Sequence, residues 1–413
     1  MANAFATLFL SRRFLVALAV GVVAAAACAA GYFAWKSRQP AERFARAAAA
    51  LDAQRFREVE RELEALAAAE GFEPHRHFLR GALLLENGKR FPALEEFGYA
   101  VDTPELRVRA LTLSGRALYE AKRFPDAVGV LMRAIEEDPD AVEAHRWLAS
   151  AYYDLGLNDQ TMVHLARIAE LDPRDGRPHR LMGLIRKDFE NYRAAIDDYR
   201  QSLQRDPVQP DRQRVLLELA ECHLKLHEDE DALAVLAEAE PSPQRWALEA
   251  EGQYDSGRVD EAERLLDQTL AASPAHLEAL LLKGTILLEK GNAAGAREAF
   301  TRATIGYPCE YPARAKLIQA CRRLGDQRAV EEQTRIAEEL KRLREEFSKL
   351  HATAAAEPNN ADVRCRLGAL ARRLDRADLA RVWFQAALAI NPQHAETLRL
   401  LAGAPPQAKD DRK

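Results

Sequence analysis

The chain has 413 residues, of which 48% are hydrophobic and 30% are charged, and its formal net charge is −5. This balance argues against nucleic-acid binding driven by bulk positive charge, so we expect no nucleic-acid partner. The five cysteines show no C-x-x-C spacing, which leaves a structural zinc site of the usual kind without support.

The first predicted element is a transmembrane signal-anchor helix over residues 14–35, preceded by an N-terminal tail at residues 1–13. Residues 14–35 carry no charge, and about twenty apolar helical residues span the roughly 30 Å hydrocarbon core of a bilayer. An aromatic cluster followed by Lys36 and Arg38 is typical of a membrane interface and a stop signal.

Two questions about this segment stay open in the sequence. A cleaved signal peptide would use the same apolar stretch, with Ala-x-Ala sites within residues 24–30, and the protein would then be secreted. We favour the anchor, because the aromatic residues extend the span to full membrane length. The count of Lys and Arg places the rest of the chain in the cytoplasm, whereas a short arginine-bearing tail before a long domain more commonly stays inside. We expect a bacterial single-pass protein with its main domain on the periplasmic side, and the cytoplasmic side is the alternative.

A 34-residue unit organises the chain after this segment. Residues 142–175 read as two short amphipathic helices that break at Gly156 and end at Asp172-Pro173, because proline cannot continue a helix. The flanking stretches repeat this pattern, and a 34-residue spacing recurs among the prolines: Pro139, Pro173 and Pro207; Pro274 and Pro308; Pro358 and Pro392. A fixed period of this size is the signature of a helical solenoid.

The unit resembles the tetratricopeptide repeat (TPR), in which small residues at fixed positions face large ones across a helix pair. Residues 277–310 match the family pattern nearly throughout, at Gly284, Gly291, Ala296, Phe300, Ala303 and Pro308. The resemblance implies an all-α fold, a right-handed α-solenoid of about ten TPR-like helix pairs, preceded by the single transmembrane helix.

Repeats are expected to start at residues 40, 74, 108, 142 and 176, and then at 213, 243, 277, 311 and 361. The motif Pro241-Ser242-Pro243 predicts a joint between an N-terminal array, residues 40–242, and a C-terminal array, residues 243–402. Residues 403–413 are polar and are expected to be disordered.

Residues 327–356 depart from the 34-residue period. Ile336, Leu340, Leu343, Phe347 and Leu350 follow one another at spacings of four and three. The pattern predicts one continuous helix, about 45 Å long, with a heptad-like apolar seam. Either this helix is an elongated second helix of the repeat at 311 that packs back on the array, or its seam docks a partner such as a second copy of the chain in a homodimer.

A search for chemistry finds no phosphate loop, dinucleotide fingerprint, H-E-x-x-H motif or nucleophile elbow. His223 and His227 are four residues apart on one helix and could turn two imidazoles toward a metal, but no third ligand is evident and His223 occupies a packing position. The sequence therefore predicts that the protein is not an enzyme and has no cofactor, metal site or catalytic residue.

The TPR resemblance also implies a partner-binding groove, since the first helix of each TPR lines a concave surface. Its groove-facing positions in the repeats at 108, 142 and 176 include eight residues that we expect to bind a partner: Arg109, Arg116, Tyr119, Arg146, Tyr153, Arg177, Arg180 and Lys187. Guanidinium groups pair bidentately with carboxylates and tyrosine adds rigid contact area. The expected partner is a protein or peptide that is acidic or ends in a free carboxylate. The alternative is that these arginines are neutralised along their own helices by Glu120, Asp154 and Asp188.

The function predicted from these features is a non-enzymatic, membrane-tethered protein–protein interaction scaffold that binds a partner segment in the TPR groove. A non-catalytic structural or assembly subunit of a membrane enzyme complex is the alternative, because such a subunit also needs only surfaces.

Overall fold

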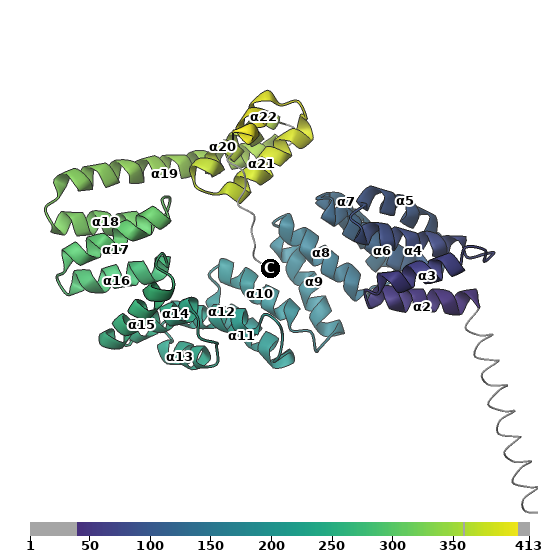
Figure 1. The fold of residues 1–413 in the computed structure, drawn as a ribbon, viewed down its shortest axis with the longest axis horizontal. Coiled ribbons are helices and arrows are strands. Elements are labelled where there is room, and N and C mark those ends of the chain that lie inside the picture. The colour runs from purple at the N-terminus through teal and green to yellow at the C-terminus, as the bar shows by residue number, and fades with distance from the viewer. Residues whose placement is uncertain (1–38, 358–359, 404–413) are drawn as a thin grey trace, which may run out of the picture. The chain divides into compact units, whose positions relative to one another are not determined.

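The computed structural model describes residues 39–357 and 360–403. Within these ranges the chain forms 21 helices and no strand, in an all-α helical repeat solenoid (Figure 1). The tail at residues 1–13, the predicted anchor at 14–35 and residues 404–413 lie outside the described ranges. No helix in the described part of the chain is both long and apolar enough to span a bilayer.

The first compact unit ends at Gln209. Its described part contains five consecutive helix pairs, each packed most extensively within itself and then against the next pair. The pairs are α2 (Pro40–Asp52) with α3 (Phe56–Ala65), α4 (Glu73–Glu86) with α5 (Arg90–Ala100), α6 (Pro104–Glu120) with α7 (Phe124–Glu137), α8 (Val142–Asp154) with α9 (Asn158–Leu171), and α10 (Arg177–Asp188) with α11 (Tyr192–Arg205).

The second unit begins at Pro210, and its described part holds five more pairs and a terminal helix. These are α12 (Arg212–Lys225) with α13 (Asp229–Ala237), α14 (Pro243–Asp255) with α15 (Val259–Ala272), α16 (Leu277–Glu289) with α17 (Ala293–Gly306), α18 (Tyr311–Arg323) with α19 (Gln327–Ala356), α20 (Ala361–Arg373) with α21 (Ala377–Ile390), and α22 (Ala395–Ala402). The joint predicted at Pro241-Ser242-Pro243 lies inside this unit, between α13 and α14, which pack together. The compact units divide instead between Gln209 and Pro210, at the three residues 210–212 that separate the repeat at 176 from the repeat at 213.

Each helix pair closes around a size match between two residues sixteen positions apart. In five pairs a glycine of the first helix faces a buried large residue of the second: Gly81–Phe97, Gly115–Leu131, Gly183–Tyr199, Gly284–Phe300 and Gly368–Phe384. A Cβ atom on Gly183 would lie 2.9 Å from Cε1 of Tyr199, closer than packed atoms approach, so the helices would have to separate.

A polar contact also recurs between the two helices of a pair, at a separation of nineteen residues. It joins Arg43 to Glu62 at 3.3 Å, His77 to Glu96 at 2.7 Å, His179 to Asp198 at 3.4 Å, Arg314 to Gln333 at 2.6 Å, and His145 to His164 at 2.9 Å. In four of these contacts a basic side chain meets a carboxylate or amide oxygen. The α8–α9 pair differs, because an imidazole replaces the acceptor oxygen.

The two imidazoles of this contact share one hydrogen between their Nδ1 atoms. The Nε2 atom of His145 lies 3.0 Å from the carbonyl oxygen of Pro139 and therefore donates to it, which leaves Nδ1 of a neutral His145 as the acceptor for Nδ1–H of His164. His164 is 8% exposed and its ring stacks on Tyr152. Burial, and then repulsion from the protonated form of His145, lower the pKa of His164 to about 4.

The long helix α19 is continuous over its 30 residues, as predicted. Its apolar seam is covered within the chain, because Leu340, Leu343 and Leu350 pack in one buried cluster with Val363 and Leu367 of α20. This arrangement matches the elongated second helix that packs back on the array. The seam is therefore already occupied in a single copy of the protein.

The size match predicts opposite effects for one substitution at two glycines of the same helix pair. Gly115→Ala should lower the free energy of unfolding by about 1–3 kcal/mol, because the new Cβ would overlap Cγ of the buried Leu131. Gly129→Ala should raise it by up to about 1 kcal/mol, since a Cβ there would meet no atom within 4 Å beyond the local backbone of its own helix, and alanine favours a helix. Chemical denaturation measures both, and equal effects would show that the contact does not limit the approach of α6 and α7.

The imidazole pair predicts a loss of stability in mild acid. The unfolded chain binds a proton on His164 near pH 6.5, whereas the folded chain binds it only near pH 4. The free energy of unfolding should therefore fall as the pH drops from about 6.5 to 4, by on the order of 3 kcal/mol from this group. His164→Gln, which keeps a donor for His145, should remove this part of the pH dependence in urea titrations. The exposed His351→Gln is the control, and an unchanged pH profile in His164→Gln would contradict the assignment.

Candidate functional site

The first helices of four successive repeats line one cavity in the first unit. Its volume is about 690 Å³, within the range of ligand-sized pockets. The lining comes mainly from α2, α4, α6 and α8 and includes Arg109 and Arg116 of the eight predicted partner-binding residues. A hollow is therefore present along first helices of the repeats, but it begins two repeats before the predicted groove and its lining contains no residue of α10.

Both arginines of the cavity are paired with carboxylates of the chain itself. Arg109 Nη2 lies 2.7 Å from Asp52 Oδ1, and its guanidinium lies over the buried Phe78 ring at 5.3 Å. Arg116 contacts Glu86 at 2.6 Å and Glu120 at 2.8 Å. Of these carboxylates, only Glu120 was predicted from the sequence as a possible partner along the same helix, and the structure confirms that pairing.

Tyr119 and Trp147 form an aromatic wall beside Arg116. The two rings lie 5.3 Å apart, and the Arg116 guanidinium is 5.7 Å from the Trp147 ring. Burial, followed by a hydrogen bond to Asp154 and the charge of that carboxylate, raises the pKa of Tyr119 to about 12. Tyr119 therefore stays protonated at neutral pH and donates its hydroxyl hydrogen to Asp154. In the sequence, Asp154 was predicted as a possible partner of an arginine.

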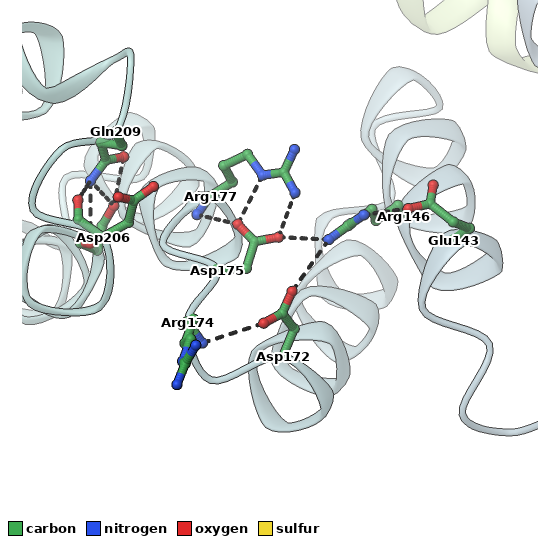
Figure 2. A network of polar contacts seen from close by, with 9 residues as sticks. Glu143, Arg146, Asp172, Arg174, Asp175, Arg177, Asp206 and Gln209 are labelled. Atoms are coloured by element: carbon green, nitrogen blue, oxygen red, sulfur yellow. Dashed lines mark hydrogen bonds and ion pairs between the residues drawn. The ribbon is translucent and has the colours of Figure 1, made fainter. Parts of the chain in front are cut away.

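Asp175 organises two further predicted arginines, as Figure 2 shows. The carboxylate is 8% exposed and accepts from Arg146 Nη2 at 2.8 Å and from Arg177 Nε and Nη2 at 2.8 and 2.9 Å. Arg146 also contacts Glu143 and lies 3.8 Å from Asp172. Burial of Asp175 raises its pKa, but hydrogen bonds from Arg177 and the charges of Arg177 and Arg146 outweigh burial, so the net pKa is lowered. The carboxylate is ionised and joins α8 to the start of α10.

The three remaining predicted residues lie along the same two helices. Tyr153 is 38% exposed near the end of α8, while Arg180 and Lys187 are half-buried on α10. The structure thus brings the eight residues onto α6, α8 and α10, with Arg109 and Arg116 in the cavity and Arg146 and Arg177 around Asp175. Whether a partner binds them stays a prediction.

The carboxylates that lie about thirty residues along the chain from their arginines were not predicted from the sequence. Arg116 reaches back thirty residues to Glu86, and Arg146 reaches forward twenty-nine to Asp175. The same separation joins Arg107 to Glu137. This separation of about thirty residues equals one 34-residue repeat less about one helical turn. Opposite charges at that spacing in the sequence are therefore the signal that could have located these pairs.

His223 belongs to a group of possible metal ligands with Glu228 and Asp231, whose ligand atoms lie within 4.8 Å of one another. The buried His223 Nδ1 contacts Glu228 at 2.7 Å. His227, the other histidine considered from the sequence, lies instead at the turn with a φ of 55°. Glu228 and Asp231 lie at the start of α13, where negative charge stabilises the helix, so the group has a structural explanation without a metal.

These features define a helical repeat protein with a ligand-sized groove. Family models described as tetratricopeptide repeat match residues 118–185, 180–245, 248–308 and 361–394, which together cover more than half of the chain. The chain belongs to the tetratricopeptide repeat family.

Similar proteins were found among curated sequences and solved structures. Superkiller complex protein 3 of Mus musculus is 26% identical over 213 residues, which are 49% of this chain and 13% of that protein. Hsp70-Hsp90 organizing protein 1 of Glycine max is 26% identical over 93 residues, 22% of this chain and 16% of that protein. The chain therefore spans less than a fifth of the length of either relative. The crystal structure of a tetratricopeptide repeat protein from Parabacteroides merdae aligns with a TM-score of 0.43 at 16% identity, covering 60% of this chain and 99% of that one.

Proposed function

We propose that this protein is a membrane-tethered protein–protein interaction scaffold that holds a partner segment in the groove of its first unit. TPR proteins generally are interaction scaffolds, and their fold is typically non-catalytic. The observation that carries the proposal is the cavity of about 690 Å³ formed by the first helices of four repeats. A non-catalytic structural or assembly subunit of a membrane enzyme complex would use the same surface.

The proposed partner carries acidic side chains or a free terminal carboxylate that meets the basic residues of α8 and α10. Arg177 supports this choice, because its side chain is 66% exposed although it contacts Asp175. Arg146, Arg180 and Lys187 lie on the same two helices. A carboxylate of the partner would exchange with a carboxylate of the chain, so recognition favours correctly placed acids over bulk negative charge.

The tether is proposed from the uncharged run at residues 14–35 and the cations that follow it. We place the repeats on the periplasmic side of a bacterial membrane. Protease added to spheroplasts should then digest the repeats, whereas protection until lysis would place them in the cytoplasm. Recovery in the soluble periplasmic fraction, with a new amino terminus within residues 24–30, would indicate the cleaved and secreted form.

Selection of ten-residue peptides with free carboxyl ends on the immobilised full-length protein tests the binding proposal. The selected sequences should be rich in Asp and Glu, and their binding should weaken as salt rises. Arg177→Gln with Lys187→Gln should raise the dissociation constant of a selected peptide at least tenfold, or about 1.4 kcal/mol. Fluorescence anisotropy measures this change.

The matched control is Arg214→Gln with Arg322→Gln, which removes two positive charges at the same repeat positions in the second unit. The control protein should bind like the wild type. Equal losses in the two double variants would show that net charge, and not the groove, captures the peptide.

A further inference from the structure

The groove of the first unit changes its charge along its length. The cavity lining contains four carboxylates, Asp52, Glu86, Asp138 and Glu143, but only two guanidinium groups, Arg109 and Arg116. Adding the partners outside the lining, Glu120 for Arg116 and Arg146 for Glu143, leaves the same excess of two carboxylates. Negative charge in a partly enclosed hollow raises the local concentration of cations.

The same cavity has an apolar wall. Its lining includes six large apolar side chains: Leu51, Leu85, Val108, Leu113, Val142 and Trp147. Arg116 already lies against one face of Trp147, which shows that this wall accepts a cation beside an aromatic ring. A large apolar side chain next to a Lys or Arg therefore matches both the surface and the charge of the hollow.

The helix α10 has the opposite character. It carries Arg177, Arg180, Arg186 and Lys187 against the single acidic residue Asp188. Asp175 offsets part of this charge from the turn before the helix, and Asp198 of α11 lies 2.6 Å from Arg186 and offsets another part. The cavity and α10 thus favour ligand groups of opposite sign within one unit of the protein.

We infer that the groove of the first unit recognises a segment of mixed polarity. A Lys or Arg beside a large apolar residue occupies the cavity between α2 and α8, and an acidic side chain or terminal carboxylate lies at α10. The inference rests on the proposed function and adds a second, cation-selective subsite to it. The helices α6 and α10 are two repeats apart, or about 20 Å at usual helix spacings, which an extended segment covers in about six residues.

Three acetylated ten-residue probes test the subsite on the full-length protein. Each probe ends in Asp-Glu with a free carboxylate and has a six-residue Gly-Ser spacer, and the probes begin with Lys-Phe, Gln-Phe or Lys-Ala. The Lys-Phe probe should bind at least fivefold more tightly than either of the others. The first comparison isolates the positive charge and the second isolates the apolar side chain.

Asp52→Asn with Glu143→Gln removes two carboxylates of the lining and should bring the ratio of Lys-Phe to Gln-Phe affinities close to one. Glu95→Gln with Glu136→Gln removes the same charge from exposed positions of α5 and α7 and should preserve the ratio. Because the ratio compares the affinities of two probes for the same protein sample, a general loss of folded protein lowers both affinities equally and leaves the ratio unchanged. A preserved ratio in Asp52→Asn/Glu143→Gln would overturn the assignment of the subsite to this cavity.

The outcomes separate this inference from the proposed function. The three probes could bind the wild-type protein equally well and all bind more weakly to the Arg177→Gln/Lys187→Gln protein. That result would overturn the cation-selective subsite and leave the acidic-end proposal standing. Failure of all probes while selected acidic peptides bind would have the same meaning. Failure of the peptide selection itself would remove the proposed function together with the inference.

Discussion

The close approach of two helices at a small residue is the contact on which the rest of the structure depends. It recurs at sixteen-residue separation in each of the ten expected repeats, with alanine or glycine on the first helix and a larger residue on the second in nine of them. The repeat at 311 reverses the sizes, with Ile318 before Thr334, so the two residues remain complementary in volume. Because this buried contact fixes each pair, the first-helix residues that face the groove are left to vary in charge without affecting the packing.

The charges of the groove are placed by contacts between repeats and do not form a free basic surface. Asp52, Glu86 and Asp175 each hold an arginine of another repeat, which for Asp175 is Arg177. An arginine held in this way keeps a fixed orientation, so less side-chain entropy is lost when a ligand contacts it. The same pairing lowers the gain from each new contact, because the ligand competes with a carboxylate of the chain. Such a groove is suited to selectivity more than to high affinity.

The fold could be predicted from the sequence because its signals are local or periodic. The helix starts at Val142, Leu277 and Tyr311 coincide with the expected repeat starts, since proline and small residues recur at a fixed spacing. The groove pairs could not be predicted in the same way. Which carboxylate thirty residues away an arginine contacts can be worked out only when the rotation between successive repeats is known. From the sequence alone, Glu86 is no more obvious a partner for Arg116 than Glu120 is. The imidazole pair of His145 and His164 was missed because the two residues are nineteen positions apart and lie on different helices.

The helix α19 shows how one element can serve two neighbours. Its first half completes the repeat at 311, where Val330 and Ala337 pack with Leu317 and Cys321 of α18. Its second half supplies Leu340, Leu343 and Leu350 to α20. A second copy of the chain could reach this seam only by displacing α20 and exposing its buried residues, including Leu367. Because exposing buried leucines costs on the order of 2 kcal/mol each, pairing of two copies through this helix would have to use its charged outer surface, where ion pairs contribute little.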